Sequence, residues 1–150
     1  MRKVMLLAAL LAACTTAETP EADTSAVTAA TPGTLTAADV AGNWTGTSML
    51  EGSDSVVSRW TAVRESDSMG KLVTEGSTDS VAYTLTFDAD SMVATSVPYP
   101  DSTIAGGAQV KFRSVGRLSD GRLIGTAVTT LATMPDSVVS RTRWEATRAP

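Results

Sequence analysis

The stretch Val81-Ala82-Tyr83-Thr84-Leu85-Thr86-Phe87-Asp88 alternates large apolar side chains with small or polar ones. Successive side chains of a β-strand point to opposite faces of the sheet, so this period of two gathers the large apolar residues on one face. Val110 and Phe112 alternate with Lys111 and Arg113 in the same way. Both stretches therefore predict strands that have one face in a core and the other in water.

A repeated dipeptide separates such runs. Asp-Ser occurs at 54–55, 67–68, 79–80, 90–91, 101–102 and 136–137, and the longest step contains Ser119-Asp120-Gly121. Asp and Ser hydrogen-bond to their own backbone and favour turns, and Asp-Gly is a strong hairpin signal. We expect a short helical turn over 37–41 capped by Thr36. We expect strands over 42–51, 55–65, 69–76, 80–88, 91–97, 107–118, 122–133 and 137–148.

These strands predict an all-β fold class. Tight turns between consecutive strands give a single antiparallel up-and-down meander of about eight strands. Closing the meander removes the exposed edges at which other chains could pair. We therefore expect a closed or nearly closed β-barrel over residues 37–150.

The segment Asp54–Arg59 recurs unchanged as Asp136–Arg141, and a tryptophan follows each copy, Trp60 at once and Trp144 two residues later than that. Either a duplication or convergence of two strands that face one interior explains the repeat. Parity places Val56, Ser58 and Trp60 on one face, and Val138, Ser140, Thr142 and Trp144 on one face. Because the opposite faces carry charged residues, we expect Trp44, Trp60 and Trp144 to point inward. Arg64 and Arg148 share the tryptophan parity, so each is expected at a barrel mouth.

Gly42-Asn43-Trp44 resembles the Gly-x-Trp signature that opens the first strand of lipocalins and related calycin barrels. In that family a basic residue late in the last strand stacks over the tryptophan, and Arg148 stands in a comparable place. The resemblance implies a calycin-like barrel that holds a small ligand. The alternative is that Trp44 is simply a core residue. The chain is shorter than a typical lipocalin domain and shows no C-terminal helix, which argues against a large cavity.

Composition excludes several function classes. The chain has 12 Lys and Arg, 16 Asp and Glu, a formal charge of −4, no histidine and one cysteine. An acidic chain is not an electrostatic nucleic-acid binder. Without histidine, and with a single cysteine, the usual catalytic bases, zinc ligands and disulfides are missing. Asp88-Ala89-Asp90 has too few oxygen ligands for calcium and is better explained as a turn. We predict no catalytic residues, no cofactor and no metal, and hence not an enzyme.

The N-terminus has the pattern of a secretory signal: Arg2 and Lys3 precede an apolar run over 4–13 that is too short to span a bilayer. The run ends in Leu11-Ala12-Ala13-Cys14, which resembles the lipobox of bacterial lipoproteins. That resemblance implies cleavage after residue 13 and a diacylglycerol on Cys14. Thr15 follows the cysteine, as in lipoproteins sent to the outer membrane. We therefore expect a lipid-anchored protein of the cell envelope, on the periplasmic face of the outer membrane.

Residues 14–36 comprise this cysteine and a Thr-, Ala- and Pro-rich segment that has too few large apolar residues to fold. We interpret it as a disordered tether between the membrane and the barrel. Without residues 1–13 the net charge becomes −6, because Arg2 and Lys3 are the only charges removed. Such a chain is repelled by anionic lipid, so the acyl chains must hold it at the membrane.

Two functions stay open. The first is a lipid-anchored barrel that binds a small apolar or amphipathic ligand, and the second is a structural or protein-interaction lipoprotein with a filled barrel. An enzyme would need converging titratable groups, which the sequence does not supply. The ligand-pocket candidates combine large aromatics with small hydroxyl residues on the inward parity: Trp44, Ser58, Trp60, Ser140, Thr142, Trp144 and Arg148.

Overall fold

The computed structural model describes residues 33–104 and 106–150, so the expected signal, Cys14 and the tether up to residue 32 lie outside the described residues. The described chain forms nine strands: β1 (Trp44–Leu50), β2 (Val56–Ser66), β3 (Met69–Thr74), β4 (Ser80–Asp88), β5 (Ser91–Ser96), β6 (Tyr99–Pro100), β7 (Gln109–Ser119), β8 (Arg122–Leu131) and β9 (Met134–Arg148). The expected strands are all present, and the two-residue β6 is additional.

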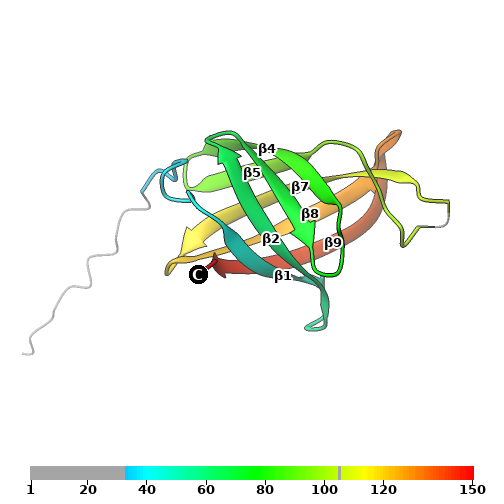
Figure 1. Ribbon diagram of the computed structural model, residues 1–150, viewed down its shortest axis with the longest axis horizontal. Helices are drawn as coiled ribbons and strands as arrows, with labels where there is room; N and C mark the ends of the chain where they lie inside the picture. Colours follow the sequence, from blue (N-terminus) through cyan, green and yellow to red (C-terminus); the bar gives the residue numbers. More distant parts are fainter. Residues whose placement is uncertain (1–32, 105) are drawn as a thin grey trace, which may run out of the picture.

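Eight of the strands close into a barrel (Figure 1). Neighbours pair antiparallel in the order β5-β4-β3-β2-β1-β9-β8-β7, and pairing of β5 with β7 completes the circle. The prediction of an all-β, antiparallel, closed up-and-down barrel is therefore confirmed. β6 pairs only with β7, through Tyr99 and Val110, and lies in the long connection between β5 and β7. No helix among the described residues is long and apolar enough to cross a membrane.

The helical turn expected over residues 37–41 is not a helix. Two backbone hydrogen bonds, from Asp39 to Thr36 and from Ala41 to Ala38, make turns that end at Gly42, whose φ is 90°. One turn before a left-handed residue cannot extend into a helix. Thr36 therefore caps no helix: its N–H donates to the Asp39 carboxylate at 2.8 Å, as in a capping box, but its hydroxyl donates to the same carboxylate at 2.6 Å.

This N-terminal segment closes one end of the barrel. Leu35 and Val40 are buried with Trp44 in the larger core cluster, although Leu35 falls in the stretch that we assigned to the tether. The Leu35 N–H donates to the carbonyl of Ala89 in the β4–β5 turn, at 2.8 Å. The Trp44 indole donates to the carbonyl of Val40, at 3.1 Å. Residues 35–40 therefore form a plug held by apolar burial and by backbone hydrogen bonds.

Aromatic side chains fill the interior where glycines leave room. Gly116 and Gly125 are paired across β7 and β8, and a Cβ on either one would lie 2.5 Å from the Trp144 ring. A Cβ on Gly46 would likewise collide with Trp60. A narrow eight-stranded barrel has little interior volume, so each tryptophan lies over neighbouring strands where glycine leaves room: Gly46 is the register partner of Trp60, and Gly125 that of Trp144.

The repeated segment forms the same irregularity twice. In β2, Ser58 pairs with Ser48 while Val56 pairs with the next residue, Met49, so Val57 is an extra residue. In β9, Ser140 and Val138 pair with the adjacent Thr129 and Thr130, which makes Val139 the extra residue. Each is a β-bulge.

The bulges overturn part of the parity prediction. Val56 and Val138 do not share the inward face of Trp60 and Trp144, because each bulge reverses the alternation. Asp136-Ser137 also lies inside β9 rather than in a turn, since the β8–β9 connection is a tight turn at residues 132–133. The sequence repeat is therefore a structural repeat of a bulged strand.

Candidate functional site

The two ends of the barrel differ. In a meander, consecutive connections alternate between the ends, so the β1–β2, β3–β4, β5–β7 and β8–β9 connections lie at the end opposite the plug, which we call the open end because the plug does not cover it. At the plugged end the guanidinium of Arg148 lies 4.7 Å from the centroid of the Trp44 ring. It also donates to the carbonyls of Asp39, at 2.7 Å, and of Ala41. The contact implied by the calycin resemblance is present, and it closes this end.

The other expected mouth residue, Arg64, also lies near the plugged end. Its guanidinium donates to the carbonyls of Ser66, at 3.1 Å, and of Asp67, at 2.9 Å, in the β2–β3 connection. Trp44 and Arg148 are therefore parts of a closure, and Trp44 connects this closure to Trp144 and Trp60 through the larger core cluster.

Trp60 and Trp144 meet in the middle of the barrel. Their ring centroids are 6.0 Å apart and the rings are inclined at 73°, an edge-to-face contact. Trp144 is buried, and Trp60 is half-buried against the same core cluster. The Trp60 indole donates to Ser48 Oγ at 2.9 Å, and the Trp144 indole donates to Ser114 Oγ at 2.8 Å. The inward orientation predicted for the tryptophans is confirmed, and both of these indole N–H groups are satisfied internally.

Three hydroxyl residues lie between this tryptophan pair and the open end. Ser58 precedes Trp60 on β2, while Ser140 and Thr142 precede Trp144 on β9, all on the inward face. All three side chains are half-buried. Within the described residues no hydrogen bond engages their hydroxyls, whereas the hydroxyls of Ser48 and Ser114 are used by the indoles. The structure therefore brings Ser58, Trp60, Ser140, Thr142 and Trp144 into one region, with three hydroxyls available to a bound molecule.

An apolar rim lines one side of the open end, over the neighbouring strands β2, β1, β9 and β8. Nine large apolar side chains are exposed in the described chain, and six belong to the β1–β2 and β8–β9 hairpins. They are Leu50, Val56, Val57, Met134, Val138 and Val139, with 39–52% of their surface exposed. Four of these six come from the two bulged repeats. Exposed apolar groups gathered at one place mark an interaction site, whereas scattered ones do not.

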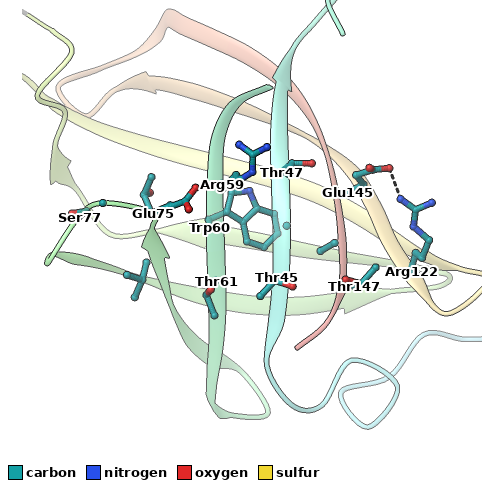
Figure 2. Close-up of a pocket in the computed structure, with 15 residues that line it drawn as sticks. Thr45, Thr47, Arg59, Trp60, Thr61, Glu75, Ser77, Arg122, Glu145 and Thr147 are labelled. Atoms are coloured by element: carbon teal, nitrogen blue, oxygen red, sulfur yellow. Dashed lines mark hydrogen bonds and ion pairs between the residues drawn. The ribbon is translucent and has the colours of Figure 1, made fainter. Parts of the chain in front are cut away.

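A groove on the outer surface was not expected from the sequence (Figure 2). It has a volume of about 570 Å³ and runs across β1, β2 and β9. Thr45, Thr47, Thr61 and Thr147 form its centre. Figure 2 shows Glu75 and Ser77 at one end and the Arg122–Glu145 ion pair, at 2.6 Å, at the other. The sequence did contain a signal for this groove, because these threonines alternate with the tryptophans and so point to the outer face. Only the register of the strands shows that they lie side by side.

A second outer groove, of about 450 Å³, lies over β7, β8 and β9. Its lining includes Met49, Val115, Ile124, Arg117 and Arg143. Neither groove is part of the region around the three inward hydroxyls, although Trp60 and Trp144 reach the linings from the inner side.

Titratable groups do not converge at the open end. The pKa of Asp39 is lowered by its hydrogen bonds from the Thr36 hydroxyl and backbone, and to a lesser degree by Arg148. Burial raises the pKa of Tyr83 and of Tyr99. Within residues 33–104 and 106–150, no three His, Cys, Asp or Glu side chains are grouped as metal ligands. The inward region offers hydroxyls, indole rings and apolar surface, which suit binding.

No protein-family model matches the chain, and neither a curated protein nor a solved structure matches it.

Proposed function

We propose that this protein is a lipid-anchored lipoprotein of the cell envelope whose small β-barrel takes up an amphipathic small molecule at its open end. The observation that carries the binding role is the difference between the two ends. One is closed by the plug and Arg148, and the other combines an apolar rim with three unengaged inward hydroxyls. A molecule with an apolar body and a polar group matches this arrangement.

The anchoring part rests on the lipobox Leu11-Ala12-Ala13-Cys14. An acyl-anchored barrel would sit on the periplasmic face of the outer membrane, where amphipathic molecules are abundant. Cys14→Ser is expected to move the protein from the membrane fraction to the soluble envelope fraction, because several acyl chains are needed for stable anchoring. If the variant stays in the membrane fraction, the lipoprotein assignment is wrong.

The binding part is tested by native mass spectrometry of the protein extracted from its own membrane, with a co-purifying small molecule as the expected result. The neutral apolar dye N-phenylnaphthylamine then serves as the probe, read by its own emission and by that of Trp60 and Trp144. A saturable signal is expected from the wild-type chain. A hydroxyl-bearing competitor should displace the dye about fivefold less well from the Thr142→Val variant, because one hydrogen bond is lost.

Thr126→Val is the matched control, because Thr126 lies on the outer face of β8, where its exposed side chain points to solvent. The proposed pocket would be overturned if both variants lost the same fraction of competitor affinity, or if the wild-type chain showed no saturable dye binding.

A second candidate function is a filled barrel that binds an envelope protein through its outer surface. The position of both grooves on the outer face of the barrel favours it, as does the internal satisfaction of the Trp60 and Trp144 indoles. The same mass spectrum separates the candidates, since a co-purifying protein without a small molecule supports the second.

A further inference from the structure

Charge is segregated around the barrel. β7, β8 and β9 together hold seven Lys and Arg and two Asp and Glu, a net charge of +5. Residues 33–100 hold three Lys and Arg and nine Asp and Glu, a net charge of −6. Seven of these nine acids lie in the plug and in the connections at the two ends of the barrel, so the strands β7, β8 and β9 are the part of the barrel wall with a strong net charge. The barrel order places β8 directly opposite β3. In Figure 1 the green strands cross over the yellow to red strands, which form the opposite wall.

Six of the seven cations lie on one outer surface, which we call the basic face: Lys111, Arg113, Arg117, Arg122, Arg141 and Arg143. All six are exposed. Arg113 and Arg141 are both paired with Val128, one from each side, so their backbones lie about 10 Å apart in a single row across three strands. Among the described residues, Arg122 has an ion pair with Glu145, and Arg143 has one with Asp54. The other four cations have no ion pair there.

The basic face also carries apolar side chains between its cations. The 450 Å³ groove lies on this face, with Val115, Ile124 and Met49 in its lining and Arg117 and Arg143 beside them. Cations interspersed with apolar side chains suit a surface of anionic headgroups above hydrocarbon, because the heads meet the charges and the apolar groups meet the glycerol region.

We propose that the basic face of β7, β8 and β9 docks on the anionic headgroups of a lipid bilayer and orients the barrel there. The negative net charge of the chain would oppose such docking only if all of its charges acted from a single point. The acidic residues of the described chain lie mainly in the connections at the two ends of the barrel, and the Debye length is about 8 Å at physiological salt, so acids farther than this from the basic face are largely screened. Our expectation that anionic lipid repels the whole chain is therefore replaced by attraction to one face.

This inference deepens the proposed function and rests on it in one respect. The proposed lipid anchor supplies a high local concentration, so that even a weak attraction sets the orientation. The attraction itself does not depend on acylation and can be measured without it. Docking through β8 would leave the plug, the open end and the threonine groove at the sides or facing away from the membrane.

The test uses the unacylated full chain carrying Cys14→Ser. Its partitioning is compared between vesicles of phosphatidylcholine with about 30 mol% phosphatidylglycerol and vesicles of phosphatidylcholine alone. The difference between the two gives the electrostatic part, to which Arg2 and Lys3 also contribute, so variants of the basic face are needed to locate it. We expect binding to the anionic vesicles that exceeds binding to the neutral ones and disappears as salt is raised.

Two matched variants locate the attraction. Arg113→Gln with Arg141→Gln removes two cations from the basic face, and Arg59→Gln with Lys71→Gln removes two exposed cations from the opposite wall. Each cation near an anionic surface contributes about fivefold in partitioning, so the first variant should lose roughly 30-fold. The second should lose about threefold at most, although its net charge changes equally.

Equal losses in the two variants would overturn the proposal, because net charge rather than the face would then govern binding. Equal partitioning of wild type to anionic and neutral vesicles would also overturn it. If instead the chain forms oligomers that Arg113→Gln with Arg141→Gln abolishes, and anionic vesicles do not bind, the proposal is overturned and the basic face meets acidic residues of a second copy. Release of the acylated Cys14 protein has no bearing on these results, so failure of the anchor and failure of the basic face are distinguishable.

Discussion

Arg148, near the C-terminal end of the last strand, lies over the ring of Trp44, at the start of the first strand, with 4.7 Å between guanidinium and ring centroid. β1 and β9 pair along their lengths, and Trp44 is the register partner of Arg148. The same guanidinium reaches the carbonyls of Asp39 and Ala41 in the plug. One side chain thus joins the two ends of the barrel sequence to the segment that closes it.

Arg148→Lys should lower the free energy of unfolding by about 1–3 kcal/mol. Lysine keeps the charge but lacks the planar fork that stacks on the indole and reaches two carbonyls at once. Urea unfolding monitored by tryptophan emission measures the loss. Arg141→Lys, at an exposed position on the outer face, should stay within about 0.5 kcal/mol of wild type. An unchanged midpoint for Arg148→Lys would mean that the plug is held by Leu35 and Val40 alone.

Gly125→Ala should destabilise the barrel by about 1–3 kcal/mol or more. The added Cβ would meet the Trp144 ring at 2.5 Å and the carbonyl of Val115, and backbone of the paired strand cannot move aside cheaply. Thermal unfolding and the near-ultraviolet circular dichroism of the tryptophans report the effect. Gly33→Ala is the control, since nothing lies within 4 Å of the Cβ it would add. Equal stability of the two variants would contradict the seating of Trp144 on glycine.

The strands and their inward faces could be predicted because alternation is a local signal. The stretch Val81–Asp88 forms β4 with Tyr83 and Leu85 buried, as its period of two requires. The Trp44–Arg148 contact was also expected, from a resemblance of three residues and one arginine. These features depend on residues that are neighbours in sequence or that belong to a known motif.

Other features depend on register and closure, which alternation does not encode. Whether Val57 is an extra residue depends on how many residues of β1 lie opposite it, and this one extra residue moves Val56 to the other face. The threonine groove and the basic face arise because β1, β2 and β9, or β7, β8 and β9, become neighbours on closure. The net charge of the chain does not reveal the basic face, because the acidic residues of the chain outnumber its basic ones.

Lowering the pH should weaken the attachment of the plug to the barrel over a narrow pH range. Hydrogen bonds from Thr36 hold the pKa of Asp39 below its ordinary value of 3.8. A carboxylate with a lowered folded-state pKa contributes stability that is present above that ordinary value and is lost as pH falls through the folded-state pKa. Thr36→Val removes the hydroxyl donor and should raise the Asp39 pKa toward 3.8, so that loosening begins at higher pH.

The Asp39 carboxyl chemical shift, followed by NMR during acid titration, measures this pKa directly. Thr84→Val, which removes an exposed hydroxyl on β4, serves as the control and should leave the Asp39 titration unchanged. If Thr36→Val also leaves it unchanged, the Thr36 hydroxyl does not stabilise the Asp39 carboxylate.

Alkaline titration should report on the core around Phe112, because the chain has two tyrosines and both face the interior beside that ring. Burial raises the pKa of Tyr83 and Tyr99 above 10.0, and Asp101 adds to the effect at Tyr99. The protonated ring is the form that the fold favours. Its stabilisation is therefore fully present below pH 10.0 and is lost as pH rises through the raised pKa.

We expect the tyrosinate absorbance to appear only above pH 10.0. The strand signal in circular dichroism should be lost over the same pH range, so that the tyrosines do not ionise before the barrel unfolds. Tyr83→Phe keeps the ring that packs against Phe112 at 6.5 Å but removes the ionisable group, so alkaline unfolding should move to higher pH. Tyr99→Phe, whose ring lies 6.3 Å from Phe112, is the matched variant and should act in the same direction. Ionisation of both tyrosines near pH 10.0 in a barrel that stays folded would show that their hydroxyls reach water, and would contradict their burial.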